Sequence, residues 1–298
     1  MGILTNFKNS SGIDIGADLV EKSYLIDQYP ELANTFRFAG LWSWGNNQFG
    51  QLGDNVITHK SSPVQTVSGG TNWKLVSCKF YDTAAIKTDG TLWLWGYNAY
   101  GELGDNSRTH RSSPVQTVAG GTNWKLVSFG ADTAAAIKTD GTLWLWGAGS
   151  YGVLGDNTST RTSSPIQTVA GGTNWKLVAS GHFSMACIKT DGTLWTWGKN
   201  SGGQLGDNAI TSKSSPVQTV SGGTNWKLID VGGYNTSCMK TDGTLWLWGR
   251  NTYGQLGDNT TANKSSPVQT VSGGTNWKLI GCGNYHIAAI RDNSNDYI

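Results

Sequence analysis

Apolar and polar positions along this chain recur with a period of 51 residues. The segment Leu-Trp-x-Trp-Gly begins at five equally spaced leucines: Leu41, Leu92, Leu143, Leu194 and Leu245. Leu-Gly-Asp-Asn and Asn-Trp-Lys-Leu follow it with the same period, and all 15 Trp lie in the first and third motifs. A fixed period of this size indicates a repeat architecture in which each copy is one supersecondary unit.

Each unit contains the pattern of four short strands. The stretch Thr83–Gly96 has two apolar runs on either side of Asp89-Gly90, which is a strong hairpin signal. Two further runs begin at Trp73 and directly after Pro63. The run after Pro63 is expected at a sheet edge, because proline has no backbone N–H to donate to a neighbouring strand.

The strand Leu92–Trp95 has large apolar side chains on both faces. Such a strand fits between two neighbouring sheets and does not fit a sheet with one wet face. Four-stranded blades packed around an axis meet this requirement. The sequence therefore predicts an all-β fold, a β-propeller of five four-stranded blades.

The two ends of the repeat region have complementary patterns. The first unit starts at Leu41–Trp44 without the strand that normally precedes this motif, and the last unit ends in Ala288–Arg291 without the strand that normally follows. Pairing of these segments would complete the fifth blade and remove two exposed sheet edges. We expect the ring to close in this way, with an open arc or a ring shared between chains as the alternatives.

Residues 1–40 are expected to form a separate, partly helical anchoring segment in front of a propeller over 41–298. Asp18 and Glu21 have the spacing of a helix N-cap with a capping acid. The apolar residues that could share one helix face are Leu19, Val20, Leu25 and Ile26. This segment is too short to fold alone, so it should dock on the propeller, on a sister chain or on a larger assembly.

Charge and composition exclude several classes of function. The 298 residues include 22 Lys and Arg against 20 Asp and Glu, a formal net charge of +2, so no strong field attracts nucleic acid. No apolar run is long enough to span a membrane, and the first residues lack the pattern of a secretory signal peptide. The four Cys are too few and too scattered for a disulfide framework.

Candidate catalytic motifs are better explained by the repeat. Gly147–Gly152 has the outline of a dinucleotide-binding turn, but Leu-Gly-Asp-Asn follows it where that turn requires a helix. The Asp of Leu-Gly-Asp-Asn recurs in all five units, which favours turn hydrogen bonds over acid catalysis or calcium binding. The four His have no Cys or carboxylate at metal-ligand spacing. We expect neither an enzyme, a metal site nor a cofactor.

The loop after each Trp-Lys-Leu strand varies in sequence among the five copies and is rich in residues that can contact a partner. Aromatic, His and Asn side chains on loops of a rigid scaffold are typical of recognition surfaces, although neutral variation would give a similar pattern. The candidate binding residues in this loop set are Phe80, Tyr81, Asp82, Asp132, His182, Phe183, Tyr234, Asn235, Tyr285 and His286.

The ordered motifs Leu-Trp-x-Trp-Gly, Leu-Gly, Pro-Val, Trp-Lys-Leu and Ala-Ala-Ile-Lys-Thr-Asp-Gly-Thr resemble the repeat of the regulator of chromosome condensation family, from Leu41 to about Arg291. Members of this family usually have seven blades, whereas this chain has five units. The eukaryotic founder of the family is an exchange factor for the GTPase Ran and binds nucleosomes. This chain has no basic tail and no long inserted wedge, so the resemblance does not extend to that activity.

The near-identical repeats and the first forty residues also resemble repeat proteins found among structural proteins of large tailed bacteriophages. The sequence analysis therefore predicts a non-enzymatic virion component, made in the host cytoplasm and held by its N-terminal segment to other virion proteins. Its displayed propeller would contact a host surface protein or glycan. The alternatives are a free protein-binding propeller, of exchange-factor or inhibitor type, a multivalent sugar-binding propeller, and a homo-oligomer of either kind.

Overall fold

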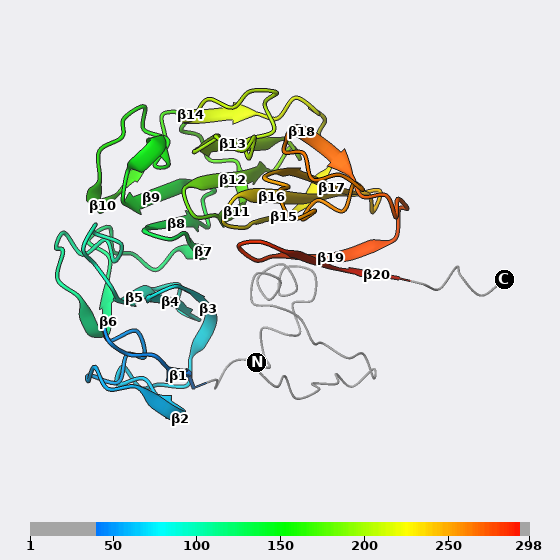
Figure 1. Cartoon of the computed structure of the whole chain (residues 1–298). Coiled ribbons are helices and arrows are strands. Elements are labelled where there is room, and N and C mark those ends of the chain that lie inside the picture. Colours follow the sequence, from blue (N-terminus) through cyan, green and yellow to red (C-terminus); the bar gives the residue numbers. More distant parts are fainter. Residues whose placement is uncertain (1–39, 293–298) are drawn as a thin grey trace.

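The computed structural model describes residues 40–292, which fold into antiparallel β-sheets arranged as blades of a propeller (Figure 1). Over this range four sheets have four strands each and two sheets have two strands each. The predicted all-β fold and the predicted four-stranded unit are confirmed. One short 3-10 turn, η1 (Ser150–Gly152), interrupts the pattern in the third unit.

The strands follow each other in the order in which the repeats run. The first two-stranded sheet holds β1 (Trp42–Gly45) and β2 (Lys60–Gln65), and the last holds β19 (Trp277–Cys282) and β20 (Ile287–Arg291). The four complete blades are β3 (Trp73–Lys79), β4 (Asp82–Lys87), β5 (Leu92–Gly96) and β6 (Arg111–Gln116); β7 (Trp124–Phe129), β8 (Thr133–Lys138), β9 (Leu143–Gly147) and β10 (Thr162–Gln167); β11 (Trp175–Ser180), β12 (Ser184–Lys189), β13 (Leu194–Gly198) and β14 (Lys213–Gln218); β15 (Trp226–Val231), β16 (Asn235–Lys240), β17 (Leu245–Gly249) and β18 (Lys264–Gln269).

Each complete blade is a meander in which consecutive strands pair. The Asp89-Gly90 turn joins β4 to β5, and Asp89 accepts hydrogen bonds from both the backbone N–H and the hydroxyl of Thr91. Gly90 has a positive φ of 80°, and a Cβ there would lie against the carbonyl oxygen of Thr122, so only glycine fits. The proline-bearing strand β6 lies at the outer edge, as predicted.

The core lies between adjacent blades and is built from the strands that have apolar side chains on both faces. The second Trp of Leu-Trp-x-Trp-Gly is 0% exposed in each complete blade, and alanines of the neighbouring strand, such as Ala84 and Ala85 on β4, are also fully buried. Burying a large aromatic side chain stabilises the fold by roughly 2–3 kcal/mol, so the repeated Trp accounts for much of the stability. This burial agrees with the expected position of the strand between two sheets.

The innermost strands β3, β7, β11 and β15 surround an axial cavity of about 260 Å³. Lys79, at the end of β3, extends across this axis. Its ammonium group donates hydrogen bonds to the carbonyl oxygens of Ser180 on β11, at 2.6 Å, and Val231 on β15, at 3.4 Å. A single side chain of the first complete blade therefore connects the third and the fourth.

The prediction that Leu41–Trp44 pairs with Ala288–Arg291 within one chain is wrong for this structure. Strand β1 pairs with β2, and β20 pairs with β19, while no pairing joins β1 to β20. Figure 1 shows the two short sheets at the separate ends of an open arc. Four joints between consecutive sheets repeat one tryptophan contact, and the five units arranged in this way leave β1–β2 and β19–β20 unpaired.

The predicted helical segment over residues 1–40, with Leu19, Val20, Leu25 and Ile26 on one face, lies outside the described residues except for Gly40. Within residues 40–292, no helix has the length and apolar character needed to cross a membrane.

Candidate binding surface at the loop rim

The loops after the Trp-Lys-Leu strands, which we call the third loop set, join the two inner strands of every blade at the same end of the sheets. The connection between β3 and β4 is the shortest, because only Phe80 and Tyr81 separate these strands. Phe80 adopts a left-handed backbone conformation with a φ of 52°, which is unfavourable for a bulky residue, and its ring is 49% exposed. Strained backbone that holds an aromatic ring in solvent is more often found at functional positions than in ordinary loops.

Five of the predicted residues come together with two aromatic neighbours in one row of rings. His182 is central: its ring stacks on Phe80 at 5.4 Å and on Phe183 at 4.5 Å, and it meets Tyr234 edge-on at 5.9 Å. Tyr234 stacks on Tyr285 at 6.0 Å. We call this set, extended by Tyr151 and Tyr253 at its edge, the aromatic rim: Phe80, Tyr151, His182, Phe183, Tyr234, Tyr253 and Tyr285.

Two cations lie over the rings of the aromatic rim. The Lys199 ammonium is 5.0 Å from the ring of Tyr151 and 5.5 Å from that of Tyr234. The Arg250 guanidinium is 5.3 Å from Tyr234 and 5.7 Å from Tyr285. These distances are within the range of cation–π attraction, so the charges help to orient the rings. The result is an amphipathic surface with aromatic and positive character.

Tyr81 belongs to a different group of rings. It meets Phe49 edge-on at 5.1 Å, and Phe49 contacts Tyr97 at 4.9 Å and His110 at 5.0 Å. His110 also has a loop-building role, because its Nδ1 accepts the backbone N–H of Asn98. The structure thus divides the predicted aromatic residues between two clusters, and the consecutive residues Phe80 and Tyr81 belong to different ones.

Three of the polar candidate residues are buried or half-buried, which does not suit residues of an exposed contact surface. Asp82 is 3% exposed and Asn235 is 0% exposed, at equivalent positions below the loops. Their side chains therefore do not present a contact surface. Asp132 is half-buried, and its charge interacts with His182. His286 is exposed at the last blade.

Acidic groups beneath the loops are strongly perturbed by burial. Burial raises the pKa of Glu102 to about 7, with a further increase from the nearby charge of Asp132. Burial also raises the pKa of Asp82 well above its usual range, and the charge of Glu102 adds to this effect. Burial lowers the pKa of His182 despite the opposing effect of Asp132, so the imidazole is neutral near pH 7.

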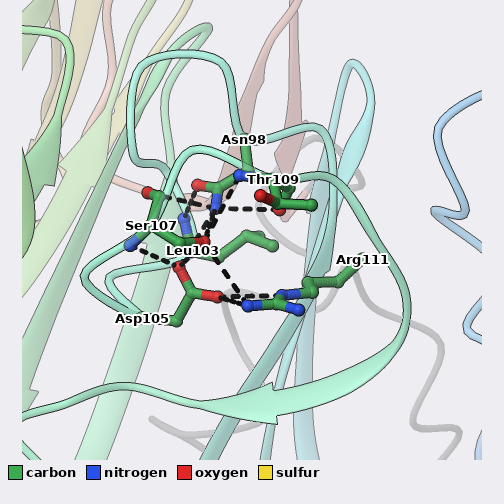
Figure 2. A network of polar contacts seen from close by, with 6 residues as sticks. All are labelled: Asn98, Leu103, Asp105, Ser107, Thr109 and Arg111. Carbon is green, nitrogen blue, oxygen red and sulfur yellow. Dashed lines mark hydrogen bonds and ion pairs between the residues drawn. The ribbon is translucent and has the colours of Figure 1, made fainter.

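The Asp of Leu-Gly-Asp-Asn has the structural role predicted for it. Figure 2 shows the example in the second unit, where the Asn98 amide donates to Asp105 at 3.1 Å and to the Thr109 carbonyl at 3.1 Å. The side-chain oxygen Oδ1 of Asn98 accepts the N–H of Leu103, and Arg111 pairs with Asp105 at 2.7 Å. The same Asn-to-Asp bond recurs at Asn47, Asn200 and Asn251. Among residues 40–292, no group of three or more His, Cys, Asp or Glu is placed to hold a metal.

Several residues of this surface were not among the binding residues predicted from the sequence. Lys199, Arg250, Tyr151 and Tyr253 lie in the loop after Leu-Trp-x-Trp-Gly, which varies among the copies and so carried a usable signal. Lys79 also had a signal in the sequence, because the equivalent position is glycine in the other four units. The proximity of these loops to the third loop set could not be read from the sequence, because it depends on blade packing.

Burial of eight of the 15 tryptophans weakens the case for a sugar-binding propeller, and the first Trp of the motif is half-buried in each complete blade. The second Trp of the motif is fully buried in the four complete blades, and the Trp of Trp-Lys-Leu is 2–4% exposed there. Exposed indoles are confined to β1, where Trp42 and Trp44 are 54% and 57% exposed. A repeated glycan site would need an exposed aromatic face in each blade.

Comparison with known proteins adds to the geometry. Residues 39–298 match the model of the RCC1-like domain. This chain belongs to the RCC1-like domain family. The family predicted from the motifs is therefore confirmed.

Relatives of this RCC1-like chain include several plant and animal proteins. It is 31% identical over 270 residues to the ultraviolet-B receptor UVR8 of Arabidopsis thaliana, a match that covers 86% of this chain and 59% of the receptor. It is 28% identical over 230 residues to the mitochondrial RCC1 domain-containing protein RUG3 of the same plant, covering 73% of this chain and 51% of that protein. The chain thus spans little more than half the length of these curated relatives.

Solved structures show the same fold at low identity. Human WBSCR16 superposes with a TM-score of 0.73 at 23% identity, covering 85% of this chain and 68% of that one. Prp20p of Saccharomyces cerevisiae, described with its binding to Gsp1p and histones, gives a TM-score of 0.73 at 17% identity, covering 86% and 65%. The arc therefore corresponds to about two thirds of each solved chain.

Proposed function

We propose that this chain is a non-enzymatic, protein-binding propeller and that the aromatic rim is its contact surface. The observation that carries the proposal is the continuous row of rings from Phe80 to Tyr285, with Lys199 and Arg250 over their faces. Tyr, Phe and Arg are enriched where protein interfaces bury their central contacts. The rings come from several blades, so the partner must be large enough to span them.

The chemistry of the rim favours a protein over a sugar. Sugar binding needs ring faces that are free to stack, whereas here each ring of the aromatic rim stacks on a neighbouring ring or lies under Lys199 or Arg250. The two cations favour a partner with acidic side chains near its own apolar contacts. Similarity to Prp20p, which binds Gsp1p and histones, supports protein recognition as the general role.

The virion placement has less support. The relatives and structures named above include a plant photoreceptor and a yeast protein that binds Gsp1p and histones, and none of those named is a virion protein. The comparisons therefore favour the alternative reading of a protein-binding propeller. Separation of particles from soluble lysate tests the virion hypothesis: recovery of the protein in particles would restore it, and recovery only in the soluble fraction would reject it.

The binding proposal is tested with three full-length baits incubated with lysate from the cells that make the protein. They are wild type, the double variant Phe183→Ala with Tyr234→Ala, and the control Val169→Ala, an exposed residue after β10. Proteins retained by wild type and control but lost with the rim variant are then purified and titrated by calorimetry. Equal retention by all three baits would reject the rim as the contact surface.

A further inference from the structure

Four joints between neighbouring blades use the same tryptophan contact. In each, the indole N–H of the second Trp in Leu-Trp-x-Trp-Gly donates to a backbone carbonyl oxygen in the loop of the preceding unit. These pairs are Trp95 with Gln51, Trp146 with Glu102, Trp197 with Val153, and Trp248 with Gln204, at 2.6–2.9 Å. The glycine two residues after each of these carbonyl groups, such as Gly53 after Gln51, lies close to the indole. A Cβ at this glycine would clash with the ring nitrogen. In each joint, the tryptophan side chain therefore fills a slot, and this glycine forms one wall of the slot.

The last unit has the same slot without a tryptophan. Gln255 and Gly257 occupy the repeat positions of Gln51 and Gly53, but the nearest atom to a Cβ on Gly257 is the side chain of Thr270, at 3.6 Å. A cavity of about 180 Å³ opens there between Leu256, Gly257 and Trp277. The buried amide nitrogen of Gln255 has no hydrogen-bond partner in the described residues. This place is shaped for an indole that the described chain does not supply.

The other end of the arc carries the matching tryptophan. Trp44 on β1 has the repeat position of Trp248, but its side chain is 57% exposed whereas that of Trp248 is 0% exposed. A Cβ on Gly45 beside it would meet no atom within 4 Å, whereas a Cβ on the equivalent Gly96 would lie against the carbonyl oxygen of Tyr81. The first unit therefore exposes the surface that every complete blade buries.

A second pair of contacts shows the same complementarity. Gly50 packs on the backbone of Ser112 in the next blade, and Asn55 donates its N–H to the Ser112 carbonyl oxygen at 2.8 Å. Gly254 has the repeat position of Gly50, yet a Cβ there would find only the Thr260 carbonyl oxygen, at 3.9 Å. The repeat position of Ser112 in the first unit is Ser61, on β2.

We propose that the β1–β2 sheet of a second copy of this chain docks on the last blade and on β19–β20, with Trp44 of that copy in the slot at Gly257. By repeat equivalence, Trp44 donates to the Gln255 carbonyl oxygen and β1 lies antiparallel to β20. Ser43 then faces Ala288, as Leu94 faces Ala84 in the second unit. The two short sheets together form one complete four-stranded blade.

The joints favour a second copy over the ends of the same chain. Each of the four joints has its tryptophan hydrogen-bonded in the same way, and the β1–β2 and β19–β20 sheets lie at separate ends of the arc in Figure 1. One chain can join its own ends only by changing the turn at these joints, whereas a second copy can dock at the slot without such a change. The contact is heterologous, because the two surfaces that meet are different.

Sedimentation of the full-length chain tests this contact. We expect wild type to self-associate and Trp44→Ala to raise the dissociation constant at least about tenfold. Trp44 is exposed within one chain, so its loss should leave the fold of the single chain intact, as unchanged far-UV circular dichroism would show. The control is Val67→Ala, because Val67 and its repeat equivalents are all exposed. A wild-type chain that stays monomeric at its highest soluble concentration overturns the proposal.

Disulfide trapping identifies which chains meet. In a Cys78→Ser background, one preparation carries Ser43→Cys and a second, larger tagged preparation carries Ala288→Cys. Facing residues of antiparallel strands have Cα atoms roughly 4.5–5.5 Å apart, which a disulfide can join. A mixed, oxidised species containing one chain of each size supports the proposal. A chain carrying both substitutions that instead forms only an internal disulfide overturns it, because its own ends then pair.

Discussion

The ammonium group of Lys79 lies 2.6 Å from the carbonyl oxygen of Ser180, a residue 101 positions later in the chain. The two residues belong to the first and third complete blades and face each other across the axial cavity. Every other unit has glycine at the position of Lys79. One substitution in an otherwise uniform repeat therefore creates a connection between distant blades.

Loss of the Lys79 contacts should destabilise the arc. Lys79→Met keeps the apolar stem but removes the donors, leaving the carbonyl oxygens of Ser180 and Val231 without this partner. Hydrogen bonds to charged groups contribute roughly 1.5–3 kcal/mol, so we expect a loss of unfolding free energy of this order in urea titrations. Lys176→Met, at an exposed position of β11, should change it by less than about 0.5 kcal/mol. Equal effects would show that the cross-axis bonds contribute nothing.

Substitution of the second Trp of the motif should cost much stability in a complete blade and little in the β1–β2 sheet. Trp95→Ala removes a fully buried indole and its bond to Gln51, and should cost roughly 3–5 kcal/mol. Trp44→Ala changes the equivalent but exposed residue, and should cost the monomeric chain less than about 1 kcal/mol. Chemical denaturation at a concentration where the chain is monomeric separates the two. Similar losses for both variants would contradict the burial seen here.

Stability should decrease with rising pH because of Glu102. Its folded pKa of about 7 exceeds the usual 4.5, so the folded state retains a proton that the unfolded state releases. Stability from this group is therefore fully present below pH 4.5 and is lost as the pH rises through about 7. One pKa unit corresponds to about 1.4 kcal/mol, which makes the whole loss on the order of 3 kcal/mol.

Glu102→Gln provides the measurement and its control in one variant. Glutamine occupies this repeat position in three other units, where its side-chain oxygen accepts the same kind of backbone N–H that Glu102 accepts from Tyr100. The variant should be more stable than wild type at pH 8 and nearly equal to it at pH 5. The difference between the two proteins cancels titrating groups that Glu102 does not affect, such as His182, and it reports Glu102 together with its coupling to Asp82. A difference that does not change with pH would refute the assignment to Glu102.

Rim substitutions should separate binding from folding. Tyr234→Ala removes a half-buried ring that stacks on Tyr285 and lies under Arg250. We expect the unfolding free energy to change by about 1 kcal/mol or less, because the core between the blades is untouched. Thermal unfolding measures this directly. A loss as large as that of Trp95→Ala would make Tyr234 a structural residue and weaken the proposed role of the rim.

The candidate site was only partly predictable for a physical reason. Variation among the copies identified the third loop set, and five of its residues do come together in the aromatic rim. The same criterion included Asp82 and Asn235, which are buried, because variation does not reveal the direction of a side chain. Lys199 and Arg250 lie in another loop of each unit, and only blade packing places them over the rings.

The sequence by itself determined the 51-residue unit, its four strands, the Asp89-Gly90 type of hairpin and the family. These features depend on residues close together in the chain, and the same local pattern produces the same local structure five times. Burial and closure depend on what lies beside a blade. Trp44 and Trp248 share one motif, yet one is exposed and the other fully buried, because only Trp248 has a preceding blade in the arc to receive it. How the blades pack against each other decides where the two short sheets lie, and no local pattern encodes that packing, which leaves β1–β2 and β19–β20 apart.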